Sequence, residues 1–263
     1  MQTPELSNAQ KNQSTEKIFR IMEFLAEQAE PCRLMDIATA LDMNQSTALR
    51  FINTLVKLGY AAQEKSSSKY YLTFKICMLS NKIMRRITLS QIARPYMREL
   101  ACAVRESACL AIEQQEQVVY IEIAEGPQQV VRAMQRIGNI APIYCTGIGK
   151  LFMLNKSREE IEHIFDTQPI IKFTENTITT KEGIFQELEQ IRKNHYACDN
   201  EECEPGARCF AVPIYNADGK IVAGLSVTGP TVRLNQDFCE KNISVLQDTA
   251  KDISSQLGWT GEI

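Results

Sequence analysis

Residues 34–72 constrain the fold of this 263-residue chain more than any other stretch. They contain two short amphipathic segments, a glycine at position 59, and two β-rich runs separated by the polar residues 64–69. The order helix, helix, strand, strand is that of a winged helix-turn-helix, in which the second of these helices enters the major groove of DNA. We therefore expect a DNA-binding unit over residues 14–73.

Three helices are predicted in this unit. The first two cover about residues 14–28 and 34–41, because apolar residues recur there at the spacing of one helix face. The third begins after Asn44, a favourable N-cap residue, and ends at Gly59, a residue typical of helix C-termini. The residues of the third helix expected to face the core are Ala48, Phe51, Leu55 and Leu58.

The opposite face of the third helix is the predicted DNA-reading surface. No Asp or Glu occurs between Met43 and Gln63. Carboxylates would repel DNA, whereas hydroxyl, amide and guanidinium groups can bond base edges and phosphates. The alternatives are an ordinary solvated helix face and an ordinary solvated hairpin. The predicted DNA contacts are Gln45, Ser46, Thr47, Arg50 and Asn53 in the helix, and Lys65 and Lys69 in the wing loop.

The distribution of charge agrees with this division of the chain. Residues 1–90 contain 12 Lys and Arg against 8 Asp and Glu, whereas residues 91–263 contain 17 against 24. A basic front on an acidic body suits a module that meets phosphates. No apolar run approaches the roughly 20 residues that span a bilayer, and residues 1–13, an expected mobile tail, lack a signal-peptide pattern. A cytoplasmic protein without membrane contact is expected.

The nine cysteines are odd in number, scattered, and free of any C-x-x-C pair. This pattern disfavours both a disulfide framework and a zinc site. The two histidines lie at no metal-ligand spacing. We therefore expect neither a bound metal nor a cofactor.

After residue 73 the chain is predicted to continue as helices. Apolar residues at helical spacing indicate one helix over about 74–89 and a second that opens at Pro95, since proline favours the first helical turn. The first of these can link two domains or simply pack on its own domain.

From residue 108 the pattern changes to short β-rich runs, which indicates antiparallel strands. Asp218-Gly219 is a strong hairpin turn, and Thr179 with Glu182 forms a possible capping box. The result is an α+β domain with one antiparallel sheet flanked by helices. Strands are expected at 109–113, 118–123, 130–134, 208–215 and 221–228, and helices at 150–155, 159–165, 181–194 and 236–257.

The segment Thr146-Gly147-Ile148-Gly149-Lys150 is a candidate anion site. Two glycines just ahead of a helix leave backbone N–H groups open to an anion. The spacing is not that of a P-loop, and Leu151 follows the lysine. A carboxylate suits such a site better than a triphosphate. The alternative is a tight turn with no ligand.

Several motifs of this sequence together resemble the IclR family of bacterial transcriptional regulators. They occur in the family's order and cover nearly everything after residue 13. Within the family the pattern is nearest to regulators of sugar-acid and keto-acid catabolism. The motifs are Ile37-Ala38, Ser46-Thr47-Ala48-Leu49-Arg50-Phe51-Ile52, Leu58-Gly59-Tyr60, Tyr144-Cys145-Thr146-Gly147-Ile148-Gly149-Lys150, Asp199-Asn200-Glu201-Glu202, Gly206-Ala207-Arg208-Cys209-Phe210-Ala211-Val212-Pro213 and Gly224-Leu225-Ser226-Val227-Thr228-Gly229-Pro230.

The resemblance implies a two-domain α+β chain. The winged helix-turn-helix at 14–73 is followed by a linker helix at 74–91 and a GAF- or PAS-like effector-binding domain at 92–263, an antiparallel sheet flanked by helices. We expect a repressor that binds a palindromic double-stranded DNA operator as a homodimer or homotetramer. A small organic acid, either a sugar acid or a keto acid, is the expected effector.

The resemblance also implies the effector-binding residues. Backbone amides can donate to a carboxylate, as can the hydroxyls of Ser226 and Thr228, and Asp199 can accept from a ligand hydroxyl. The alternatives are a solvated acid at Asp199 and core packing at Cys209 and Ser226. The implied set is Gly147, Ile148, Asp199, Cys209, Ser226 and Thr228.

Two other functional classes compete with this prediction. Cys209 or Cys145 with His195 would make the thiol–imidazole pair of an enzyme, although no nucleophile elbow or metal motif is present. A redox-sensing regulator would use Cys198, Cys203 and Cys209, and it would need an exposed thiol of low pKa.

Overall fold

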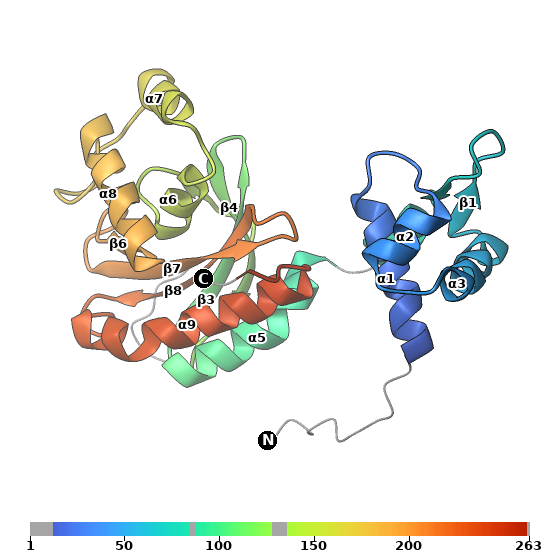
Figure 1. Ribbon diagram of the computed structural model, residues 1–263. Helices are drawn as coiled ribbons and strands as arrows, with labels where there is room; N and C mark the ends of the chain where they lie inside the picture. The colour runs from blue at the N-terminus through green and yellow to red at the C-terminus, as the bar shows by residue number, and fades with distance from the viewer. Residues whose placement is uncertain (1–12, 85–87, 128–135, 262–263) are drawn as a thin grey trace. The chain divides into compact units, whose positions relative to one another are not determined.

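The computed structural model describes residues 13–84, 88–127 and 136–261 (Figure 1). The expected tail, apart from Gln13, and the expected strand at 130–134 lie outside these residues. The chain divides into two compact units, Met1–Ile87 and Thr88–Ile263, which are described separately. Within the described residues, no helix is both long enough and apolar enough to cross a membrane.

The N-terminal unit is a winged helix-turn-helix, as predicted. Its elements are α1 (Gln13–Glu27), α2 (Leu34–Ala40), α3 (Gln45–Leu58), β1 (Ala61–Gln63) and β2 (Tyr70–Leu72). The two strands are antiparallel, with Ala61 opposite Leu72. Gly59 ends α3 in the left-handed conformation, with φ of 78°. A small core joins the helices to the wing and contains Ile21, Leu25, Ile37, Phe51, Ile52, Leu55, Ala61 and Tyr70.

Two details of α3 differ from the prediction. Leu58 was expected in the core but is 52% exposed, whereas Ile52 is fully buried. The buried stripe is centred between Ala48 and Leu55, so Leu58 falls at its edge, in the last turn before the chain reverses. Asn44 occupies the N-cap position, but its side chain makes no capping hydrogen bond.

The helices that follow begin at different places from those expected. Helix α4 spans Lys75–Met84 and α5 spans Leu89–Val104. The predictions of a helix that continues to residue 89 and of a second helix that opens at Pro95 were therefore wrong. Thr88 and Gln91 form a capping box, because the Gln91 amide donates to Thr88 Oγ1 at 3.3 Å and the Thr88 amide donates to Gln91 Oε1 at 2.9 Å. These bonds start α5 six residues before Pro95, which lies inside the helix and removes one backbone hydrogen bond.

The C-terminal unit is an α+β domain, and its described residues form one sheet of six strands in the order β5-β4-β3-β8-β7-β6. All pairs of neighbouring strands are antiparallel. Strands β5 and β6 were not predicted, because they are only three and four residues long and too short for a clear alternation. The strands are β3 (Ser107–Gln114), β4 (Gln117–Ala124), β5 (Ile140–Pro142), β6 (Ala197–Asn200), β7 (Ala207–Tyr215) and β8 (Ile221–Pro230).

Helices cover both faces of this sheet (Figure 1). Helix α5 packs with α9 (Gln236–Gln256) on one face, over a core that includes Phe210 and Leu225. The other face carries α6 (Gly147–Met153), and α7 (Arg158–Thr167) and α8 (Lys181–Asn194) belong to the core on that side. Successive residues of β7 and β8 therefore point into different cores.

Local side-chain bonds explain the turns of this unit. Asn216 Oδ1 accepts from the amides of Asp218 and Lys220, both at 3.0 Å, and Gly219 has φ of 73°. The β7–β8 hairpin is thus confirmed. The cap of α8 is Thr180 rather than the expected Thr179, since Thr180 Oγ1 accepts from the Gly183 amide at 3.2 Å.

Candidate functional site

The predicted DNA-reading face of α3 is open to solvent. Gln45, Ser46, Arg50 and Asn53 are exposed, and Thr47 is half-buried. The Arg50 guanidinium lies 5.0 Å from the ring centroid of Phe51, so its charged group lies over a ring that belongs to the unit's own core. The exposed face of α3 contains no carboxylate.

The wing loop presents its two lysines differently. Lys65 is exposed, whereas Lys69 is half-buried at the base of the loop. Backbone bonds close the loop, with the Glu64 amide donating to Lys69 O at 2.8 Å and the Ser68 amide donating to Glu64 O at 2.9 Å. Lys65 is therefore the better placed of the two for a phosphate contact.

The glycine-rich segment lies inside α6 rather than ahead of it. The helix begins at Gly147, and its N-cap Thr146 accepts from the Gly149 amide through Oγ1 at 3.0 Å. The glycines are needed for close packing: a Cβ on Gly149 would lie 2.2 Å from Ile143 O, and one on Gly147 would lie 3.2 Å from Cys209 Sγ. The expectation of an open turn before the helix was wrong. The amides of Gly147 and Ile148 still have no acceptor within the helix, as in any first turn.

Strands β6, β7 and β8 bring the other candidate residues beneath α6. Asp199 is opposite Cys209, and Cys209 is opposite Thr228. Ser226 lies two residues before Thr228 on β8, so the two side chains point to the same face of the sheet. Gly147 closes this cluster from above, because a Cβ there would contact Cys209 and lie 3.5 Å from the Asp199 amide nitrogen.

The cluster is polar but almost closed to water. Ser226 is 1% exposed, and its Oγ makes no hydrogen bond of normal geometry, although the Cys209 thiol lies close enough to interact with it. Burial, together with the charge of Asp199, raises the pKa of the Cys209 thiol. Burial also raises the pKa of Asp199. Asp199 Oδ1 accepts from the Glu202 amide at 2.8 Å, so the carboxylate is held by its own turn and is not the solvated acid considered above.

A buried lysine beside this cluster was missed by the sequence reasoning. Lys150 is 0% exposed, and its Nζ donates to Glu187 Oε1 and Glu202 Oε1, both at 2.7 Å, and to Cys198 O. It thereby joins α6 to α8 and to β6. Burial, partly offset by Lys150, raises the pKa of Glu202 to about 7. The only sequence signal was the acidic run at 201–204, which resembles a solvated surface.

The cysteines and the histidine that an enzyme or a redox sensor would use are not arranged for that chemistry. His195 is exposed at the end of α8, whereas Cys145 and Cys209 are buried, and across the described residues no hydrogen bond joins His195 to either thiol. Cys203 instead lies against Cys145, with the sulfur atoms 3.4 Å apart. Burial raises the pKa of Cys198 to about 12, and the pKa values of Cys203 and Cys209 are also raised. Raised pKa values disfavour the thiolate that a redox sensor requires.

Comparisons with known proteins find a family match in each of the two units. Residues 14–65 match the model of the IclR helix-turn-helix domain, and residues 81–255 match that of the bacterial transcriptional regulator IclR C-terminal domain.

Relatives and solved structures agree with these matches. The HTH-type transcriptional regulator KdgR of Escherichia coli is 35% identical over 92% of this chain and 92% of its own length. The DNA-binding transcriptional repressor YiaJ of the same organism is 29% identical over 94% of this chain and 89% of its own. The crystal structure of the Thermotoga maritima IclR has a TM-score of 0.62 and 28% identity, and the match covers 94% of this chain and 99% of that chain.

Proposed function

Because the chain belongs to the IclR family of bacterial transcriptional regulators, we propose that it is a repressor controlled by a small organic acid. It is a DNA-binding regulator and not an enzyme, as its relatives are named. In this proposal, residues 14–73 bind DNA, residues 74–91 link the two domains, and residues 92–263 bind the effector. The protein acts in the cytoplasm as a homodimer or homotetramer on a palindromic operator, which matches the two-fold symmetry of a dimer.

The exposed, acid-free face of α3 supports the DNA half of this proposal. Gln45, Ser46 and Thr47 stand at the N-terminal end of the helix, where recognition helices contact base edges. Arg50 follows one turn later and can bind guanine or phosphate, and Asn53 extends the same surface. Lys65 and Lys69 of the wing contact phosphates.

Operator binding tests the DNA half. The operator is first selected from random duplexes by the full-length protein. Arg50→Ala is expected to weaken binding roughly 5- to 150-fold, the range for losing one good base contact. Lys57→Ala, at the far end of the same exposed face, is the matched control and should have a smaller effect. An unchanged affinity for the Arg50→Ala protein would remove α3 as the reading helix.

The cluster beneath α6 carries the effector half. The amides of Gly147 and Ile148 donate to a ligand carboxylate, as do the hydroxyls of Ser226 and Thr228. Asp199, held by its turn through Oδ1, accepts from a ligand hydroxyl through Oδ2, and Cys209 completes the floor. The buried Oγ of Ser226, which has the Cys209 thiol beside it but makes no hydrogen bond of normal geometry, is the single observation that supports a ligand here most directly, because buried hydroxyls are normally bonded.

A ligand screen tests the effector half. A ligand that binds the folded state raises its melting temperature, so thermal shifts of the full chain are measured with D-gluconate, D-galacturonate, pyruvate and 2-oxoglutarate. Asp199→Ala combined with Ser226→Ala should abolish the shift and the effect on operator binding, while leaving operator binding itself. Asp218→Ala, in the exposed β7–β8 turn, is the control. A response that survives the double substitution would place the effector elsewhere.

Effector binding can change DNA binding only if the effector binds two arrangements of the protein with different affinities. An effector shifts the equilibrium between DNA-competent and DNA-incompetent forms by its difference in affinity for them. Operator affinity measured with and without the active acid gives this coupling directly.

A further inference from the structure

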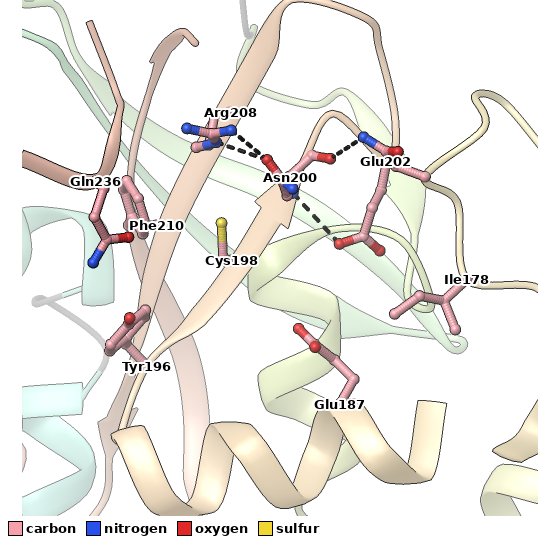
Figure 2. A pocket seen from close by; sticks show the side chains of 10 residues that line it. Ile178, Glu187, Tyr196, Cys198, Asn200, Glu202, Arg208, Phe210 and Gln236 are labelled. Carbon is pink, nitrogen blue, oxygen red and sulfur yellow. Dashed lines mark hydrogen bonds between the residues drawn. The ribbon is translucent and has the colours of Figure 1, made fainter. Parts of the chain in front are cut away.

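A hollow lies at the edge of the sheet, beside β6 (Figure 2). It has a volume of about 640 Å³. Cys198 and Phe210 belong to the core on the α9 side, whereas Ile178 packs against the core on the α6 side. The hollow therefore lies at the edge where the two cores meet, and its lining contains none of the candidate effector residues of the cluster beneath α6. Its lining residues are Asn176, Ile178, Glu187, Tyr196, Cys198, Asn200, Glu202, Arg208, Phe210 and Gln236.

The chemistry of this lining matches hydroxyl groups. Six of the ten side chains are amides, carboxylates or a guanidinium, which place donors beside acceptors, and two are aromatic. A hydroxyl both donates and accepts, so it can bond both kinds of group at once. The carboxylates of Glu187 and Glu202 are balanced by Arg208 and by Lys150, which bonds both of them from behind. This balance favours a neutral ligand over an organic anion.

One carboxylate of the lining has an oxygen that lacks a hydrogen-bond donor. Glu202 is 4% exposed, and its Oε2 has no hydrogen-bond partner. Its other oxygen receives Lys150 Nζ at 2.7 Å and the Asn200 amide at 3.4 Å. Figure 2 shows the carboxylate pointing into the space between Asn200, Ile178 and Glu187. A buried oxygen without a donor is costly, and a ligand hydroxyl placed there removes that cost.

The edge of β6 is not prepared for an added protein strand. An edge strand recruits another strand through its open backbone groups. Here the carbonyl of Cys198 is occupied by Lys150, the amide of Asn200 donates to Glu202, and the carbonyl of Asn200 accepts from Asn176 at 3.0 Å. The side chains around the hollow are thus better placed to meet a small molecule than a peptide.

We propose that the hollow beside β6 is a second ligand site, which binds a neutral, hydroxyl-rich small molecule such as a monosaccharide or a cyclic polyol. Glu202 and Glu187 accept from its hydroxyls, Asn176, Arg208 and Gln236 donate to them, and Tyr196 offers an aromatic face. The site shares no lining residue with the proposed organic-acid site, and the two meet where the Glu202 amide donates to Asp199 Oδ1.

Titration calorimetry and hydrogen exchange of the full chain test this site. The probes are D-glucose, D-galactose, D-xylose and myo-inositol, with D-gluconate as the anionic comparison. At least one neutral probe should bind saturably, with a Kd of about 1 mM or tighter, as expected for a ligand of roughly 12 heavy atoms. It should slow exchange over residues 196–202. Ser226→Ala, which alters only the cluster beneath α6, should leave this binding unchanged.

Variants of exposed lining residues make the test decisive. Asn176→Ala combined with Gln236→Ala should weaken the binding about tenfold or more, and both residues are exposed, so the fold should hold. Asn194→Ala combined with Gln256→Ala, on exposed surfaces away from the lining, is the matched control. The proposal is overturned if no neutral probe binds at up to about 50 mM, if protection falls on residues 146–149 instead, or if the lining variant binds as well as the control.

Discussion

The proposed DNA-reading face of α3 and the proposed effector cluster beneath α6 are built in opposite ways. The residues of the first are neighbours on one helix and are exposed, apart from the half-buried Thr47. Those of the second come from one helix and three strands between residues 147 and 228, and they are nearly closed to water. The face of α3 lies on the outside of a core that holds the helix in place, whereas the cluster beneath α6 includes residues of a core itself. A surface site of this kind depends on local periodicity, and a buried one depends on strand register and on the groups that satisfy buried charge.

The sharpest way to separate the two regions is to remove the buried charge at Lys150. Lys150→Met would leave Glu202 and Glu187 without their cation, and breaking a buried ion pair costs about 3–5 kcal/mol. The single tryptophan, Trp259, stacks on Tyr215 at 4.9 Å, so its fluorescence follows unfolding of the C-terminal unit. Urea titration should show the loss there.

A compensated variant checks the cause of that loss. Lys150→Met combined with Glu187→Gln and Glu202→Gln removes all three charges, and it should recover much of the stability. A single Lys150→Met protein that unfolds like the wild type would show that the cluster has no structural role.

A substitution on the core side of α3 should destabilise the N-terminal unit. Ile52→Ala is expected to cost about 2–5 kcal/mol, since Ile52 is fully buried. Leu58→Ala should cost less than about 1 kcal/mol, because Leu58 is half-exposed. Circular dichroism and operator binding report the N-terminal unit, while Trp259 fluorescence should stay unchanged. Equal losses for both variants would contradict the packing of α3 described here.

The two regions should also differ in their response to pH. The pKa of Glu202 is raised to about 7 in the folded state, mainly by burial, and that of Asp199 is raised by the same cause. At a pH between the unfolded-state and the folded-state pKa of such a carboxyl, the folded C-terminal unit therefore binds more protons than the unfolded chain. Its free energy of unfolding falls as pH rises through this window. Between about pH 5.5 and 7.5 the loss should be on the order of 2 kcal/mol.

Urea titrations followed by Trp259 fluorescence at both pH values measure this loss. Glu202→Gln should flatten the dependence, whereas Glu204→Gln, on the exposed side of the same turn, should keep it. A slope of the opposite sign would mean that Lys150 dominates the titration of Glu202.

The smallest expected difference concerns the caps of the two key helices. Thr146 caps α6 through the Gly149 amide and donates to Pro142 O at 2.9 Å, so Thr146→Ala should cost about 1 kcal/mol or more. Asn44 makes no capping bond, and Asn44→Ala should cost well under that amount. Thermal unfolding of each unit measures both. A larger loss for Asn44→Ala would indicate a capping bond that forms in solution.

Prediction from sequence succeeded where structure follows from local pattern. The helices of the N-terminal unit, the β7–β8 hairpin and helix α8 followed from apolar spacing, Asp218-Gly219 and helical periodicity. It failed where a competing local bond or a distant contact decided the outcome. The capping box at Thr88 started α5 ahead of Pro95, and α6 began at Gly147, three residues before the expected start at Lys150. The short edge strand β6 exists because β7 pairs with it.

The candidate site divides in the same way. The residue types on the exposed face of α3 were sufficient to nominate Gln45, Ser46, Thr47, Arg50 and Asn53. Family resemblance nominated Asp199, Cys209, Ser226 and Thr228, and the strand register then placed Asp199 and Thr228 on either side of Cys209. Lys150 and Glu202 escaped notice, because a lysine near an acidic run gives no sign in sequence that it is buried.

The sequence by itself determined the family, through motifs spread along the chain. It also determined the order of elements in the winged helix and the exposed, acid-free face of α3, since these depend on residues a few positions apart. Only the tertiary structure decided which face of β7 and β8 lies beneath α6, why Gly147 and Gly149 must lack a side chain, and that Lys150 is buried against Glu187 and Glu202. These depend on contacts between segments tens of residues apart, where burial and pairing set the energies. No periodicity in the chain records them.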